Sequence, residues 1–206
     1  MRTPVLDVFR PFVLGLARLY FELELRGADR VPPSGGLLIT PNHQSFADPP
    51  LVTIPVHRPV YYMAWSRLFA IPGFGWFIRR LRAFPVELEA RDSRATRESI
   101  RLLRAGEAVM IFPEGGRSVD GRVGTFKLGA FRLAVSVGVP VIPVSIAGAH
   151  EAWPPGRRLP RPGRITITYH SPEYPDPRLD PREAARRLAE RAHAVISEAL
   201  AATSRA

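Results

Sequence analysis

A histidine and an aspartate that could act as an acid–base pair lie five positions apart, at His43 and Asp48. They belong to the segment TPNHQSFADP, residues 40–49, which follows an apolar run. On one helix this spacing turns the second side chain by about 140° from the first, so the chain must turn between them for the two to meet. A carboxylate that holds an imidazole fixes its tautomer and raises its basicity. The pair therefore predicts a general base that works near neutral pH.

The spacing alone has little specificity, because it recurs at His193 and Glu198 inside a helical pattern where we expect no function. A second polar cluster, IFPEGGRS at residues 111–118, follows another apolar run. Its Pro and two Gly end the strand, and a Gly-rich backbone can present N–H groups to an anion. Arg117 adds a planar fork suited to phosphate, and Glu114 can accept hydrogen bonds from a polyol. A tight turn closed by a Glu–Arg surface pair is the alternative for these residues.

Aromatic and basic residues are combined in a third segment, LFAIPGFGWFIRRLR at residues 68–82. Arg79, Arg80 and Arg82 follow the large apolar side chains directly. Long cationic side chains beside aromatic rings are typical of a surface that contacts lipid headgroups and acyl chains. Core packing is the alternative for the individual aromatics, and we expect at least half of them to be buried.

Composition narrows the classes of protein. The 206 residues favour one domain, and 46% hydrophobic with 23% charged residues excludes a disordered chain. The absence of Cys excludes disulfides, Cys-based zinc sites and thiolate catalysis. A net charge of +10 indicates an anionic partner such as nucleic acid, a phospholipid surface or an acidic carrier protein. Only one Lys (Lys127), one Asn (Asn42) and one Gln (Gln44) occur, and the last two flank His43.

Strands and helices alternate along the chain, which predicts a single α/β sandwich with a mixed central sheet flanked by helices. Helices are expected at 92–105, with Asp92 near its N-cap, at 126–137, and after Asp180, where a proline and a glutamate mark the start. The expected strands are apolar runs at residues 36–40, 60–64, 83–86, 108–112, 141–146 and 165–169.

Apolar residues recur every three to four positions over residues 4–25, which predicts an amphipathic N-terminal helix. Its longest uncharged run is the seven residues 11–17, too short for the roughly 20 that span a bilayer. The apolar stripe can lie in a membrane interface or pack on the domain. We therefore divide the chain into an N-terminal amphipathic helix at residues 1–27, which is a candidate for membrane association, and a domain at residues 28–206.

Taken together, the motifs resemble those of the glycerophospholipid acyltransferases of the 1-acylglycerol-3-phosphate acyltransferase type. The resemblance covers residues 36–148. NHxxxxD at 42–48 matches the first block of that family, and FPEGxRS at 112–118 matches the third. VPVIPV at 139–144 matches the fourth, and FKxG at 126–129 is similar to the segment after the third block.

The resemblance implies an O-acyltransferase in which His43, oriented by Asp48, removes the proton from a lysophospholipid hydroxyl as it attacks an acyl thioester. No metal and no organic cofactor is implied, because the thioester supplies the driving force. The acyl donor would be acyl-coenzyme A or acyl-carrier protein. The residues expected to bind substrate are Glu114, Gly115, Gly116, Arg117, Arg79, Arg80 and Lys127.

Two positions depart from the family pattern. Gly116 stands where Thr is usual, and Leu88 stands where an Arg linked with the substrate phosphate is usual. Arg79, Arg80 or Arg91 could take the place of that Arg. A different hydroxyl or an amino-lipid as acceptor is therefore the alternative to 1-acylglycerol-3-phosphate.

The resemblance also implies a peripheral protein at the cytoplasmic face of the cell membrane, with a phospholipid surface as partner and no spanning helix. Two functions of other classes compete with it. A nucleic-acid-binding module is motivated only by the net charge of +10, and no nucleic-acid motif supports it, so we expect no nucleic-acid partner. A non-catalytic lipid-binding protein is motivated by Leu88, and intact His43 and Asp48 argue against it.

Overall fold

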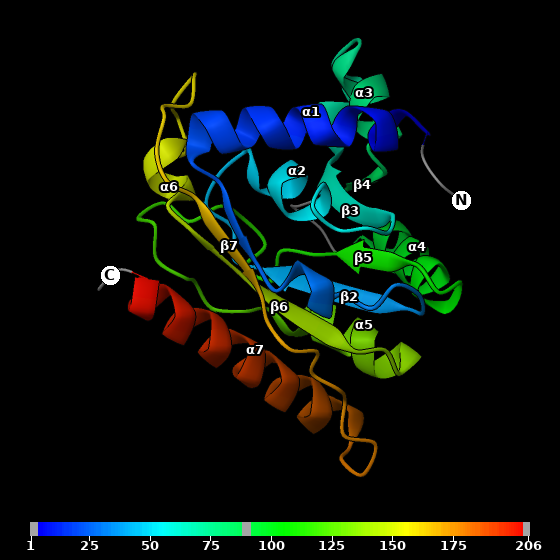
Figure 1. The fold of residues 1–206 in the computed structure, drawn as a ribbon. Coiled ribbons are helices and arrows are strands. Elements are labelled where there is room, and N and C mark those ends of the chain that lie inside the picture. The colour runs from blue at the N-terminus through cyan, green and yellow to red at the C-terminus, as the bar shows by residue number, and fades with distance from the viewer. Residues whose placement is uncertain (1–3, 88–91, 204–206) are drawn as a thin grey trace.

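A computed structural model describes residues 4–87 and 92–203, without the side chains of residues 4–10 and 13. Leu88 and Arg91 therefore lie outside the described residues. The chain forms one seven-stranded sheet in the order β1-β7-β6-β2-β5-β3-β4 (Figure 1). The strands are β1 (Glu24–Arg26), β2 (Leu37–Pro41), β3 (Val60–Trp65), β4 (Ala83–Val86), β5 (Ala108–Met110), β6 (Val141–Ala147) and β7 (Thr166–Tyr169).

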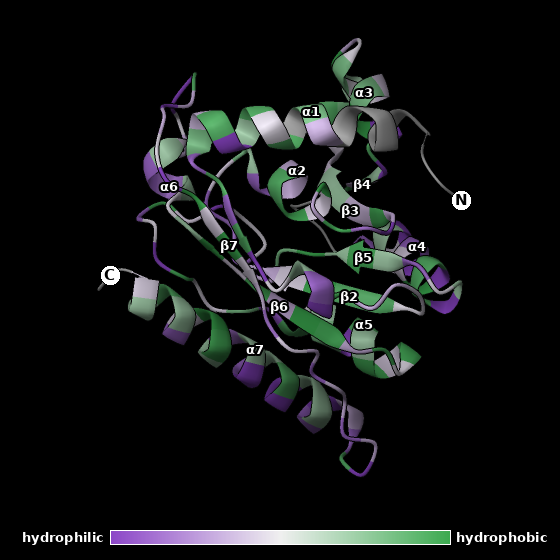
Figure 2. Cartoon of the chain, viewed as in Figure 1, coloured by the Kyte–Doolittle hydropathy of each residue, from purple (hydrophilic) through white to green (hydrophobic). Residues whose placement is uncertain are grey.

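The sheet is mixed, as expected from the sequence. Neighbouring strands from β6 across to β4 are parallel, whereas β7 pairs antiparallel with β6 and parallel with β1. Every residue of β2 is buried, because helices cover both faces of the sheet. This explains why the central strands read as continuous apolar runs, which Figure 2 shows as hydrophobic colouring on β2 and β6.

Helices pack on both faces of the sheet, and successive strand residues point to opposite faces. Leu37 and Ile39 of β2 join one core cluster, and Leu38 between them joins the other. The first cluster lies under α1 (Pro4–Phe21), α2 (Asp48–Thr53) and α3 (Phe74–Arg80), and the second under α4 (Ser93–Arg104), α5 (Leu128–Val137) and α7 (Pro181–Thr203). The short elements are η1 (Ala28–Arg30), η2 (Ser66–Ala70) and α6 (Ala149–Ala152).

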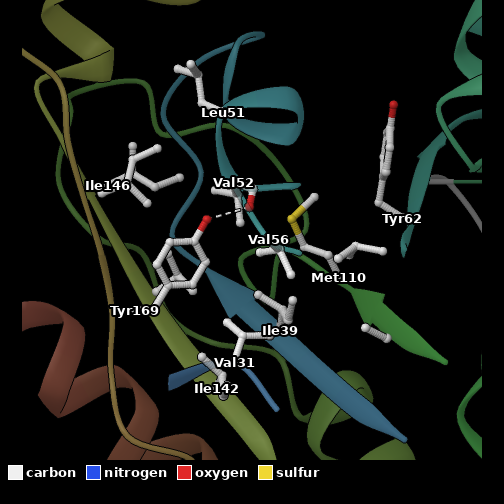
Figure 3. Packing of buried hydrophobic residues seen from close by; sticks show 14 of the residues in the cluster. Val31, Ile39, Leu51, Val52, Val56, Tyr62, Met110, Ile142, Ile146 and Tyr169 are labelled. Atoms are coloured by element: carbon white, nitrogen blue, oxygen red, sulfur yellow. Dashed lines mark hydrogen bonds between the residues drawn. The ribbon is translucent and has the colours of Figure 1, made fainter. Parts of the chain in front are cut away.

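Tyr169 links the sheet to α2, the helix that begins at Asp48. Its hydroxyl donates a 2.5 Å hydrogen bond to the carbonyl of Val52 in α2 (Figure 3). Burial raises the pKa of this phenol, so it stays protonated and remains a donor. The bond therefore fixes α2, which begins at Asp48, to strand β7.

The N-terminal helix α1 ends at Phe21, four residues before the end of the expected segment. Its Ala17 is buried in the first core cluster, whereas Leu19 is 84% exposed and Phe12 and Leu16 are also exposed. The hydroxyl of Tyr20 donates to the carbonyl of Pro160 in the loop before β7. Among the described residues, no helix is both long and apolar enough to cross a membrane.

The parallel strands bring the candidate site residues to one edge of the sheet. β2, β5 and β6 are adjacent and parallel, so their carboxyl ends lie together. His43 follows β2, Glu114 follows β5, and α6 follows β6. Ligands of open α/β sheets bind at this edge, so the fold assembles the two predicted motifs at a place suited to chemistry.

Candidate active site

The chain turns between His43 and Asp48, as their spacing required. The Nδ1 atom of His43 lies 2.8 Å from Oδ2 of Asp48. The same oxygen accepts the backbone N–H groups of Gln44 at 2.6 Å and Ser45 at 2.8 Å. Asp48 is fully buried, whereas the His43 side chain is 17% exposed. A buried carboxylate with these three donors has one orientation, so it holds the imidazole in place.

The ring of His43 also stacks on Phe112, with 3.8 Å between the ring centroids and 17° between the planes. With Nδ1–H donated to the aspartate, Nε2 is the nitrogen able to take up a proton. The partial exposure of the side chain leaves it open to a substrate. The dyad therefore has the arrangement of a general base.

Glu114 also holds the loop that carries His43, through hydrogen bonds to backbone N–H groups. Its Oε1 accepts the backbone N–H of His43 at 2.8 Å, and its Oε2 accepts that of Gly124 at 2.8 Å. The carbonyl of His43 in turn accepts the N–H of Ser118 at 2.7 Å. Burial raises the pKa of Glu114, although the two backbone N–H groups act in the opposite direction. No ion pair joins Glu114 to Arg117, both of which are described, so the alternative of a turn closed by that pair is wrong.

Lys127 is brought to the glycine-rich loop. Gly115 has a φ of +75°, a left-handed conformation that favours glycine. A Cβ built there would collide with the Nζ end of the Lys127 side chain, so this side chain crosses directly over Gly115. Gly116 next to it has open space around its Cα. The loop is thus a backbone turn beside the amine of the one lysine in the chain.

Arg117 reaches from the same loop toward the dyad's turn. Its guanidinium carbon lies 3.5 Å from the centroid of the Phe46 ring. Within the described part of the chain, its buried Nη1 has no hydrogen-bond partner. Burial lowers the pKa of Arg117, and the charge of Asp48 acts in the opposite direction. A cation thus lies on the turn that connects His43 to Asp48.

Asn42 and Gln44 anchor this turn to its surroundings. The Asn42 side chain donates to the carbonyl of Ile146 at 3.0 Å and accepts the N–H of the same residue at 2.7 Å. The Gln44 side chain donates to the carbonyl of Gly121 at 2.8 Å and accepts from the N–H of His150 at 3.4 Å. In the sequence, Asn42 and Gln44 were marked by their single occurrence, and Asn42 also by the NHxxxxD motif, whereas their partners lie 77 to 106 positions away.

Arg79 and Arg80 lie elsewhere, at the end of α3. Their guanidinium groups cover aromatic rings, at 4.7 Å from Phe69 and 4.8 Å from Trp76. Among the described residues, neither has an ion pair or hydrogen bond to the dyad or to the glycine-rich loop.

Most aromatic residues of the segment 68–82 are exposed rather than buried, contrary to our expectation. The exposed large apolar residues of this segment are Ile71, Phe74, Trp76 and Phe77.

A shallow, open surface pocket of about 450 Å³ adjoins Glu114 and Arg117. Loop residues supply its walls, and the side chains include cationic and hydroxyl groups. Within the described residues, no group of three or more His, Asp and Glu is arranged to hold a metal ion. The lining is completed by Gly116, Ser118, Val119, Asp120, Arg122, Val123, Gly124 and Thr125.

The family model named Acyltransferase matches residues 22–147, which include both motifs and the strands that carry them. The chain belongs to this acyltransferase family. The resemblance inferred from the sequence motifs is thus confirmed, since the match covers more than half of the chain.

The chain is similar to a solved structure and to several curated proteins. It is similar to the crystal structure of the 1-acyl-sn-glycerophosphate (LPA) acyltransferase PlsC from Thermotoga maritima, with a TM-score of 0.79 and 33% identity over 94% of this chain and 79% of that one. This likeness confirms the expected α/β fold.

A 1-acyl-sn-glycerol-3-phosphate acyltransferase of Pseudomonas aeruginosa is 28% identical over 94% of this chain and 75% of its own length. A chloroplastic 1-acyl-sn-glycerol-3-phosphate acyltransferase of Brassica napus is 30% identical over 75% of this chain and 46% of its own length. The chain thus spans about half the length of the plant and algal relatives it matches.

Proposed function

We propose that this protein transfers a fatty acyl group from an acyl thioester to the free hydroxyl of 1-acyl-sn-glycerol-3-phosphate, which gives phosphatidic acid. The observation that carries the proposal is the 2.8 Å contact between His43 Nδ1 and the buried Asp48 carboxylate. Membership of the acyltransferase family and the names of its relatives support the substrate class.

In the proposed mechanism Nε2 of His43 takes the proton of the acceptor hydroxyl as its oxygen attacks the thioester carbonyl. The tetrahedral intermediate collapses, the carbon–sulfur bond breaks, and the thiolate receives the proton from the imidazolium. Asp48 stabilises that imidazolium and keeps Nδ1 protonated throughout. One base thus serves both proton transfers, and the reaction needs no covalent acyl-enzyme and no cofactor.

We assign the acceptor headgroup to the glycine-rich loop. Arg117 and Lys127 supply two cations beside Gly115 and Gly116, and phosphate is an anion that such cations and backbone N–H groups bind. Glu114 has both carboxylate oxygens engaged by backbone N–H groups, so its contribution to headgroup binding is to hold the loop in position. These groups account for an anionic acceptor without an Arg at position 88.

Membrane attachment is proposed to involve two surfaces. One is the exposed apolar side of α1, within the N-terminal unit of residues 1–27, and the other is the aromatic and basic surface of α3 with Arg79 and Arg80. Both lie at the same side of the molecule (Figure 1). Anionic lipid on the cytoplasmic face would attract the basic residues, and the acyl donor, coenzyme A or carrier protein, would approach from water.

A panel of acceptors and donors tests the proposed function. Purified protein is incubated with 1-acylglycerol-3-phosphate, other lysophospholipids or monoacylglycerol, each with acyl-coenzyme A or acyl-carrier protein, and the lipids are read by mass spectrometry. We expect phosphatidic acid from the first acceptor. Product from phosphate-free acceptors alone, or no product with either donor, would contradict the proposal.

A further inference from the structure

We propose that Phe46 is a positioning residue that fixes the guanidinium of Arg117 for an anionic acceptor headgroup. Phe46 lies in the turn between the two dyad residues and makes no hydrogen bond through its side chain. Its ring stands instead under Arg117, 3.5 Å from the guanidinium carbon. The inference rests on the proposed function, because it concerns how that acceptor is held.

Phe46 is a surface residue on whose ring other side chains stack, and it is not a core residue. Phe46 is 50% exposed although it is a large apolar residue, and it lies inside the segment 42–48 that carries His43 and Asp48. Trp153, which follows α6, lies 5.8 Å from it between ring centroids and is tilted by 58°. The aromatic pair limits the movement of Phe46, and Phe46 in turn limits that of the guanidinium stacked on it.

Within the described part of the chain, no polar contact sets the direction of Arg117. Among the described residues, no carboxylate forms an ion pair with it, and its buried Nη1 lacks a hydrogen-bond partner. An arginine side chain loses rotamer freedom when it binds a ligand, and prior ordering reduces that cost. Stacking on an aromatic face orders the guanidinium. Because Nη1 is buried, Nε and Nη2 are the nitrogens left to bind phosphate.

The position of Phe46 also relates the headgroup to the dyad. Phe46 is two residues before Asp48 and three after His43, and the backbone N–H groups of Gln44 and Ser45 are bound by the Asp48 carboxylate. A phosphate held by Arg117 therefore has a fixed place relative to His43. The ring thus contributes to acceptor binding without touching the reacting atoms.

The test compares Phe46→Leu, which removes the aromatic face at similar volume, with Phe46→Tyr, which keeps it. For 1-acylglycerol-3-phosphate we expect Phe46→Leu to raise KM about tenfold with kcat within about twofold, in line with the strength of cation–π contacts. Phe46→Tyr should keep the wild-type KM. Tyr174→Leu is the matched control, because it removes a 63% exposed aromatic ring beside α7, away from the glycine-rich loop.

Two further measurements separate positioning from a general structural effect. In an Arg117→Ala background, Phe46→Leu should raise KM no further, and thermal unfolding of both Phe46 variants should match that of wild type. A wild-type KM for Phe46→Leu, an equal defect in Phe46→Tyr, or an additive effect in the Arg117→Ala background would overturn the inference while the proposed function stands. A wild-type protein unable to acylate any phosphate-bearing acceptor would overturn the proposed function and the inference with it.

Discussion

Replacing Glu114 with alanine is expected to release the glycine-rich loop from His43. The carboxylate accepts the backbone N–H of His43 through one oxygen and that of Gly124 through the other, both at 2.8 Å. Alanine leaves both donors without this acceptor. The His43 amide is partly buried, so leaving it without an acceptor costs about 1–3 kcal/mol. At the more exposed Gly124, water can replace the lost carboxylate oxygen.

Burial raises the pKa of Glu114, so the folded state disfavours its ionised form. Alanine removes this unfavourable burial, which offsets part of the destabilisation. We expect Glu114→Ala to lower the free energy of unfolding by about 1–2 kcal/mol near pH 7. Movement of the His43 backbone should lower kcat roughly 100-fold, since a displacement of about 1 Å has such an effect on catalysis.

Denaturant unfolding and initial rates of acyl transfer measure the two effects, with Glu114→Gln as the matched variant. Glutamine keeps one carbonyl oxygen, so it retains one of the two hydrogen bonds and should give intermediate stability and kcat. Unchanged stability and kcat in Glu114→Ala, with a KM increase for the acceptor alone, would refute the bracing role and leave Glu114 as a headgroup contact.

Three further predictions follow from other parts of the structure. Asp48→Asn cannot stabilise an imidazolium and should lower kcat about 10³- to 10⁴-fold in rate assays, and a loss under tenfold would contradict this. Burial, and then the charge of Arg30, lower the pKa of His170, whose Nε2 lies 3.1 Å from Ser145 Oγ. Unfolding should therefore become easier as pH falls below about 6.5, where the unfolded chain binds the proton more tightly. In denaturant midpoints measured from pH 5 to 8, His170→Gln should lack that step, and an unchanged profile would argue against it. The double variant Leu16→Glu with Leu19→Glu should sediment less with anionic liposomes than wild type does, whereas Tyr174→Glu should sediment like wild type. If wild type, the double variant and Tyr174→Glu all sediment equally, α1 is excluded as the attachment surface.

Long elements could be predicted from the sequence because their local signals agree with the tertiary structure. The helix from Ser93 to Arg104 begins where expected, with Asp92 accepting the N–H groups of Arg94 and Ala95. Parallel strands that are buried on both faces carry apolar residues at successive positions, so they appear in the sequence as apolar runs. Short helices such as α2 and α6 offer too few residues for a periodic pattern, and β1 holds three residues whose pairing with β7 is purely tertiary.

In the site, too, contacts within one segment could be predicted from the sequence, whereas contacts between distant segments could not. The meeting of His43 and Asp48 could be anticipated because both residues lie in one short segment and their chemistry requires contact. The bond from the His43 backbone to Glu114 spans 71 positions, so no local pattern contains it. The stacking of Arg117 on Phe46 likewise depends on how the loops after β2 and β5 meet, which follows from strand order rather than from either segment.

The most direct test of the central claim is acyl transfer by His43→Ala, compared with His57→Ala. His57 is exposed and lies outside the site, so its substitution controls for loss of an imidazole. With 1-acylglycerol-3-phosphate and acyl-coenzyme A or acyl-carrier protein, whichever donor the wild type uses, His57→Ala should keep the wild-type rate. His43→Ala, folded as judged by the same unfolding transition, should lose at least about 10³-fold in kcat. Retained acyl transfer by a folded His43→Ala protein would contradict the account.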